Sequence, residues 1–181
     1  MAASVITNGN FESGSLSPWF QSNDYSAGTN WGITNVAHTG SFGAFDIGNK
    51  EIQQNFAGVA VSSITELSFW IMHPDAGVTA FAYDFFYSDG SSNQLVKFTS
   101  GTAWQQFNLV GDLAAGKTLT GFGLFGNSGG STYLDDVVIT TATAPGGIPE
   151  PATWALMLVG VGAVGAGMRH KQRQTVRLNF A

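Results

Sequence analysis

The sequence contains no cysteine among its 181 residues. This absence excludes disulfide bonds, thiolate metal sites and a cysteine nucleophile. The fold must therefore be stabilised by the packing of its core, and a chain of this length can bury a core of sufficient size.

Basic residues are scarce before position 149. Residues 1–148 contain eleven acidic residues and only three basic ones, Lys50, Lys97 and Lys117, so their net charge is about −8. The remainder has one acid and four bases, which gives about +3. An acidic domain with so few bases lacks the positive surface to which phosphate backbones bind. This charge excludes nucleic acid as a partner and disfavours polyanions in general.

One long run that is both uncharged and apolar extends from Ala152 to Met168, and the bases Arg169, Lys171 and Arg173 follow it. As a helix, the run would be about 25 Å long, slightly shorter than a hydrocarbon core of roughly 30 Å. The basic side chains at one end and Trp154 at the other can reach the two interfaces. The run has no polar face, which a helix on a globular surface would have. We therefore predict a transmembrane helix at 152–168.

The segment before this run is Pro149-Glu150-Pro151. Because proline lacks a backbone donor and has a fixed φ, neither a strand nor a helix continues through this segment. Glu150 is therefore expected in an extended, accessible stretch that suits a protease. The positive-inside rule keeps the basic cluster in the cytoplasm and places residues 1–148 on the opposite side of the membrane.

Residues Ile148 to Arg173 resemble the PEP-CTERM sorting signal of Gram-negative bacteria. The resemblance implies that an exosortase, a membrane-embedded cysteine protease or transpeptidase, recognises Pro149-Glu150-Pro151. It also implies removal of the helix and delivery of the domain to the cell envelope, the outer surface or the exterior. Members of this family share the tail and differ in cargo, so the tail predicts a destination and no activity.

The sequence divides into a domain at 1–140, a linker at 141–147 rich in Thr, Ala, Pro and Gly, the signal at 148–173 and a short tail at 174–181. That last segment departs from the family, which usually ends soon after the basic cluster. No charged and apolar leader precedes Ser4, so we expect that a signal peptide was removed or that the start site lies further upstream.

The domain is predicted to be all-β. Clusters of Gly, Ser, Thr and Asn recur about every eight to twelve residues, and short β-branched and aromatic runs lie between them. Residues 67–72 and 80–87 alternate between a more apolar and a more polar face. Ten strands, which fit a jelly-roll β-sandwich, are predicted at 4–7, 31–35, 42–46, 51–56, 64–73, 78–88, 94–99, 104–109, 119–125 and 132–140.

The two ends of the domain carry a second resemblance. Asn8–Gly14 with Leu16–Trp19 resembles the opening of jelly-roll carbohydrate-binding modules of the galactose-binding-like superfamily, and Tyr133–Val137 resembles their closing strand. Between them, His38–Ala44 is similar to the turn into the third strand, and Leu67–Trp70 to the central strand. The resemblance implies a β-sandwich that binds carbohydrate.

The same resemblance implies a structural calcium ion (Ca²⁺) held by Glu12 and by Asp135 or Asp136, with backbone carbonyl groups near Gly40. Calcium takes six to eight hard oxygen ligands, which carboxylates and carbonyls can supply. Adjacent aspartates in a strand point to opposite faces, so we expect one to bind the ion and the other to be solvated. The alternative is that all three are ordinary surface carboxylates.

A sugar-binding site requires an exposed aromatic face with polar groups beside it. Aromatic residues in strands more often belong to the core, and we assign Trp19 and Trp104 to packing. The candidates for ligand binding are Trp31, Trp70, Tyr83 and Tyr87, with Asp84 and Gln105 as polar neighbours.

The leading hypothesis is a non-enzymatic exported protein with a structural or adhesive role linked to exopolysaccharide or biofilm. A calcium-stabilised carbohydrate-binding module is the alternative. A glycoside hydrolase is a third hypothesis, which would require two carboxylates that face each other in a cleft. Gly126-Asn127-Ser128-Gly129-Gly130 matches a nucleophile motif only formally, because a strand rather than a helix is expected after it.

Overall fold

The computed structural model describes residues 4–22, 30–75, 77–126 and 130–142, together with Leu158, Val159, Val161 and Met168, which are helical. The chain divides into two compact units, Met1–Ala142 and Thr143–Ala181. Within the described residues, no helix is long and apolar enough to cross a membrane. Most of the predicted helix at 152–168 lies outside the described residues, as do Pro149, Glu150, Pro151, Trp154, Arg169, Lys171 and Arg173.

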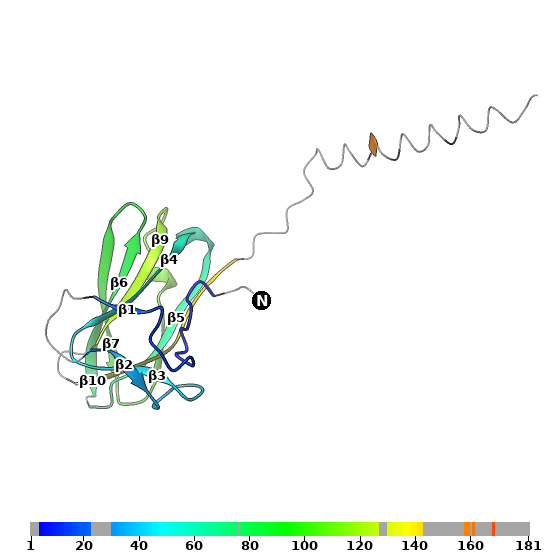
Figure 1. The fold of residues 1–181 in the computed structure, drawn as a ribbon. Helices are drawn as coiled ribbons and strands as arrows, with labels where there is room; N and C mark the ends of the chain where they lie inside the picture. The colour runs from blue at the N-terminus through cyan, green and yellow to red at the C-terminus, as the bar shows by residue number, and fades with distance from the viewer. Residues whose placement is uncertain are drawn as a thin grey trace, which may run out of the picture. The chain divides into compact units, whose positions relative to one another are not determined.

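The first unit is a jelly-roll sandwich of two antiparallel sheets, as predicted (Figure 1). Sheet I has the strand order β1 (Phe20–Gln21), β4 (Glu51–Ala60), β9 (Thr118–Phe125), β6 (Val78–Tyr87) and β7 (Ser92–Ser100). Sheet II has the order β2 (Gly32–Thr34), β3 (Gly43–Ile47), β10 (Ser131–Thr141), β5 (Ile64–Met72) and β8 (Gln105–Asn108). Two short 3₁₀ turns, Val61–Ser63 and Val110–Asp112, lie at the strand ends.

The core lies between the inner faces of the two sheets, and the predicted alternation accounts for it. In β5 the side chains of Leu67, Phe69 and Ile71 are completely buried. In β6 Phe81, Tyr83, Phe85 and Tyr87 are buried in the same way, while the residues between them lie on the outer face. The rings of Phe69 and Phe81 meet edge to face at 5.8 Å and join the two layers.

The start of the chain differs from the prediction. Residues 4–7 form no strand; Ser4 makes a single bridge to Thr140, and the peptide groups of Thr7 bind the side chain of Gln54. Because the Gln54 amide both donates to and accepts from Thr7, it takes the hydrogen bonds that a neighbouring strand would supply. The two-residue strand β1 was not predicted, since so short an element has no detectable periodicity.

His73 is a buried histidine at the end of β5. It is 1% exposed, and its Nδ1 lies 3.0 Å from the Thr99 hydroxyl, while its Nε2 has no hydrogen-bond partner among the described residues. Burial lowers the pKa of His73 to about 4, and the nearby Asp75 only partly opposes this shift. The imidazole is therefore neutral in the folded domain at neutral pH.

This burial predicts a pH-dependent stability. The folded pKa lies below the unfolded value of about 6.5, so the contribution is complete above that pH and is lost as the pH falls toward 4. We expect the free energy of unfolding to decrease by about 3 kcal/mol over this window because of His73. Denaturant melts of the wild type and of His73→Gln at several pH values measure this decrease in the free energy of unfolding. Equal pH profiles for the two proteins would contradict it.

Candidate functional site

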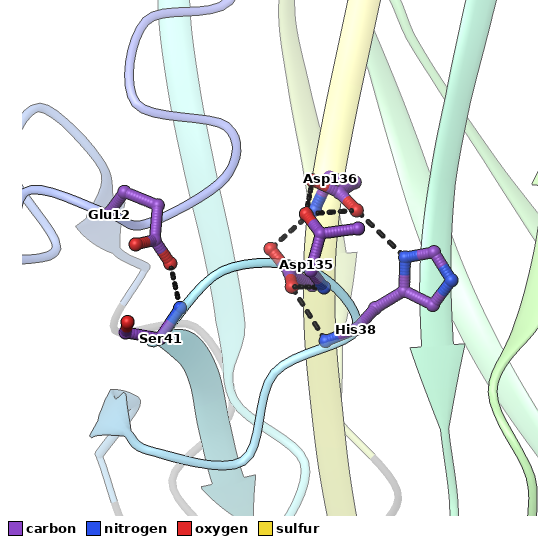
Figure 2. Close-up of polar contacts among 6 residues, drawn as sticks. Glu12, His38, Ser41, Asp135 and Asp136 are labelled. Atoms are coloured by element: carbon purple, nitrogen blue, oxygen red, sulfur yellow. Dashed lines mark hydrogen bonds and ion pairs between the residues drawn. The ribbon is translucent and has the colours of Figure 1, made fainter.

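A turn over residues 38–42 is held by two carboxylates that come from opposite ends of the domain. Glu12 Oε1 accepts the backbone N–H groups of Ser41 and Phe42, both at 2.8 Å. Asp135 Oδ2, in β10, accepts those of His38 and Thr39 at 2.8 and 3.1 Å. Figure 2 shows Glu12 meeting the turn at Ser41 and Asp135 meeting it at His38. The residues that carry the resemblance to carbohydrate-binding modules are thus brought together in space.

Asp136 also faces this turn, which corrects the prediction that adjacent aspartates point to opposite faces. Its Oδ2 lies 2.8 Å from His38 Nδ1, and both of its oxygens accept the Thr39 hydroxyl at 2.9 Å. The register of β10 shifts after Asp135, and Asp136 has a positive φ of 49°. This irregularity breaks the alternation of the strand and directs both carboxylates to the same turn. Asp136 is therefore bound within the domain and not freely solvated.

Asp135 is fully buried, yet both of its oxygens have donors. Besides the two N–H groups of the turn, Oδ1 accepts the N–H of Asp136 at 2.7 Å. Burial raises the pKa of Asp135, and the three backbone donors oppose that shift because they favour the ionised form. Hydrogen bonds to a charged group contribute about 1.5 to 3 kcal/mol each, so these contacts fix the position of the turn strongly.

The turn places His38 on the outer face of sheet II. The imidazole stacks on Trp70 with a centroid distance of 3.7 Å and an interplanar angle of 13°. Trp104 meets the same imidazole edge to face at 5.8 Å. Trp104, which we had assigned to packing, is only partly buried and belongs to this surface group. The assignment of Trp19 to the core is confirmed.

Three of the four predicted ligand-binding aromatics lie in the core. Trp31, Tyr83 and Tyr87 are 3%, 1% and 4% exposed, so a sugar cannot stack on them. Their polar tips bind inside the domain: Trp31 Nε1 donates to the Lys50 carbonyl, Tyr83 donates to Asp112, and Tyr87 accepts from the Ala114 N–H. The prediction was wrong for these three because each lies on the face of its segment that the other sheet covers. Trp70 alone is on an outer face.

On the outer face of sheet I, a row of paired residues crosses all five strands. The paired residues are, in order, Phe20, Gln53, Gly123, Asp84 and Gln94. At about 4.8 Å between strands, the row is about 19 Å long. Burial raises the pKa of Asp84, and Gln94, whose Nε2 lies 3.4 Å from the carboxylate, opposes the shift. Of the two predicted polar neighbours, Asp84 lies in this row, whereas Gln105 binds the backbone of Ser100.

Two glycines of β9 leave the centre of this face without side chains. At Gly121 a Cβ atom would stand 2.6 Å from Asn55 Oδ1 and 3.3 Å from Phe86 Cδ2, and at Gly123 it would clash with the Glu51 carboxylate. The amide of Asn55 and the ring of Phe86 therefore lie across the β9 backbone. Gln53 Nε2 donates to Asn55 Oδ1 at 2.7 Å and orients that amide. We name the set Phe20, Gln53, Asn55, Asp84, Phe86 and Gln94 the sheet I face.

Comparison with known protein families identifies one motif. Residues 147–173 match the PEP-CTERM protein-sorting motif, one residue longer than the predicted signal at 148–173. The chain thus carries this sorting motif at its C-terminal end, as the sequence indicated. A search of curated proteins found no match to the sequence.

Comparison with solved structures shows the fold of carbohydrate-binding modules. TmCBM61 in complex with β-1,4-galactotriose is 20% identical, with a TM-score of 0.55, and the match covers 78% of this chain and all of that one. The CBM22-1 xylan-binding domain from Paenibacillus barcinonensis Xyn10C is 12% identical, with a TM-score of 0.55, over 80% of this chain and 97% of that one. At these identities the likeness establishes the jelly-roll fold alone.

Some similar structures belong to enzymes. The enzymatically active domain of tailspike protein 4 from bacteriophage CBA120 is 15% identical, with a TM-score of 0.60. The match covers 77% of this chain but only 21% of the tailspike chain. The fold therefore occurs both in isolated binding modules and as a part of larger enzymes.

The predicted calcium ligands can be narrowed by their contacts. Glu12 Oε2 accepts no hydrogen bond within the described residues, and Gly40 leaves room for this carboxylate against the turn. Both oxygens of Asp135 and both oxygens of Asp136 accept hydrogen bonds, so Glu12 Oε2 is the oxygen of the three predicted ligands that is open to calcium. The described part of the chain contains no group of three His, Cys, Asp or Glu side chains that could hold a metal, so backbone carbonyls would supply the other ligands.

Calcium at this turn stays a prediction that melting experiments can test. A metal bound only by the folded state stabilises it by mass action, about 2.7 kcal/mol at a hundredfold excess over the dissociation constant. We expect the melting temperature of the wild type to rise with added calcium and to fall with a chelator. The variant Glu12→Gln, which keeps an oxygen for the Ser41 and Phe42 amides, should lose this response. An unchanged wild-type melting temperature would rule the site out.

Proposed function

We propose that this protein is exported, processed by an exosortase at the Pro149-Glu150-Pro151 segment, and binds polysaccharide outside the cell in a structural or adhesive role. The observation that supports it most is the combination, in one chain, of a PEP-CTERM motif and the fold of carbohydrate-binding modules. The motif supports export and processing, and the fold of the sandwich supports binding of polysaccharide. The apolar run at 152–168 would hold the chain in the membrane, with the folded unit outside, until cleavage.

The sheet I face has the chemistry that polysaccharide binding needs. The rings of Phe20 and Phe86 offer apolar surfaces for the C–H faces of sugars, and Phe20 is 43% exposed. The amides of Gln53, Asn55 and Gln94 can each donate to and accept from hydroxyl groups. Because the row runs across the strands, a linear polysaccharide can contact several of these groups at once.

Charge favours a neutral polysaccharide over an anionic one. The sheet I face contains the carboxylate of Asp84 and no base, and the Glu51 carboxylate lies across Gly123 in the same row. The three bases of the first unit are engaged elsewhere: Lys50 with Asn30, Lys97 with Asp112 and Lys117 with Asp89. A chain rich in uronate or sulfate groups would therefore meet repulsion without a compensating partner. Binding without catalysis is the activity that this arrangement supports.

Exosortase processing can be tested in a host that carries the enzyme. Replacing Glu150 by Ala within the Pro149-Glu150-Pro151 segment should leave the protein uncleaved and retained in the membrane fraction. The readout is the size and location of the protein on immunoblots, with Glu66→Ala as a matched acidic control outside the motif. Normal release of the Glu150→Ala protein would contradict the assignment.

Polysaccharide binding can be tested by affinity electrophoresis of the full chain in mild detergent. The gels contain soluble neutral polysaccharides, among them xylan and β-1,4-galactan. We expect Phe86→Ala and Asn55→Ala to weaken binding about tenfold, which corresponds to about 1.4 kcal/mol, because each removes a direct contact. Phe42→Ala, an exposed aromatic outside this face, is the control and should bind as the wild type does. Equal retardation of all four proteins would show that the binding site lies elsewhere on the protein.

A further inference from the structure

We propose that the outer face of sheet II carries a second carbohydrate-contact surface, which makes one copy of the protein bivalent. This surface comprises Trp70, Trp104, Tyr133 and His38, and we name it the sheet II patch. The proposal rests on the proposed function for its class of ligand, polysaccharide, but it concerns different residues on the opposite side of the sandwich.

The tryptophans and tyrosines that the structure describes in the domain divide into two groups by what their polar atoms contact. In the core, Trp19, Trp31, Tyr83 and Tyr87 each have a hydrogen-bond partner within the domain. In the sheet II patch, the Nε1 atoms of Trp70 and Trp104, the Tyr133 hydroxyl and His38 Nε2 have no partner among the described residues. Aromatic side chains with an apolar body and an open polar tip are typical of binding surfaces.

The patch is continuous across neighbouring strands. Tyr133 in β10 pairs with Met72 in β5, two residues from Trp70, so Tyr133 and Trp70 are diagonal neighbours on one face. The Tyr133 ring also contacts Phe45 of β3 with a centroid distance of 4.8 Å. At the other end, His38 joins Trp70 to Trp104. All these side chains are partly buried, so part of each remains accessible to solvent.

The turn at 38–42 gives the patch a defined shape. His38 is fixed by its backbone N–H on Asp135 and by its ring on Asp136. In Figure 2 the second ring nitrogen points away from Asp136. This nitrogen is open to a sugar hydroxyl group, and the Trp104 ring, which meets the same imidazole at 5.8 Å, offers a surface for the C–H face of a sugar. Gln106, exposed and paired with Trp70 across the sheet, adds an amide.

Two binding sites on opposite faces of the sandwich would allow one copy of the protein to bind two polysaccharide segments. The outer faces of two stacked sheets point in opposite directions, so they cannot both contact one straight segment of polysaccharide. A single copy would therefore connect two segments, and many copies would cross-link a polysaccharide into a network. Such cross-linking would explain an adhesive role without oligomerisation of the protein.

The test compares variants of the two faces on the full chain in mild detergent. It uses whichever of xylan and β-1,4-galactan retards the wild type in affinity gels. We measure the binding stoichiometry by titration calorimetry and cross-linking by turbidity. Wild type should bind two segments per protein and turn the solution turbid. Trp104→Ala and Tyr133→Ala should each halve the stoichiometry and abolish turbidity while still being retarded.

Phe86→Ala is the matched variant on the sheet I face, and it should also halve the stoichiometry. Melting temperatures confirm that each variant is folded, and Trp104→Phe provides a milder change that keeps a ring. If Trp104→Ala and Tyr133→Ala behave as the wild type does, the second surface is overturned and binding on the sheet I face stands. If the wild type is retarded by neither polysaccharide, the proposed function fails and the second surface with it.

Discussion

The contacts of Asp135 with the turn at 38–42 are the interaction on which the surface of this domain depends. A fully buried carboxylate is stable only if donors surround it, and here three backbone N–H groups do so. Glu12 holds the other side of the same turn. The opening segment, a loop and the last strand are thereby tied together, and His38 is held against Trp70.

The sheet I face depends on a different constraint, the absence of side chains from the middle strand. With glycine at positions 121 and 123, the side chains of Asn55, Phe86 and Glu51 lie across the β9 backbone. Any larger residue at these positions would displace them. The fold thus presents a polar and aromatic row on one outer face and an aromatic patch with open polar tips on the other.

The two units of the chain bear on different aspects of the protein's function. The PEP-CTERM motif bears on where the protein is delivered, and it lies outside the unit that forms the sandwich. The sandwich shares its fold with a module solved in complex with β-1,4-galactotriose, with a xylan-binding domain and with part of a phage enzyme. Because the fold is common to binding and catalytic proteins, it does not decide the activity, which depends on particular residues at the surface.

The sequence by itself determined the sorting motif, the all-β class and the alternation of β6 between two faces, because each depends on the order and spacing of nearby residues. Only the tertiary structure decided which aromatics are buried: spacing separates the faces of a strand, but strand pairing decides which face Trp31 or Tyr83 presents to the core. The same holds for Asp136, whose positive φ reverses its expected direction, and for the row from Phe20 to Gln94, which joins five strands. Long-range pairing, which no local pattern encodes, is the physical reason.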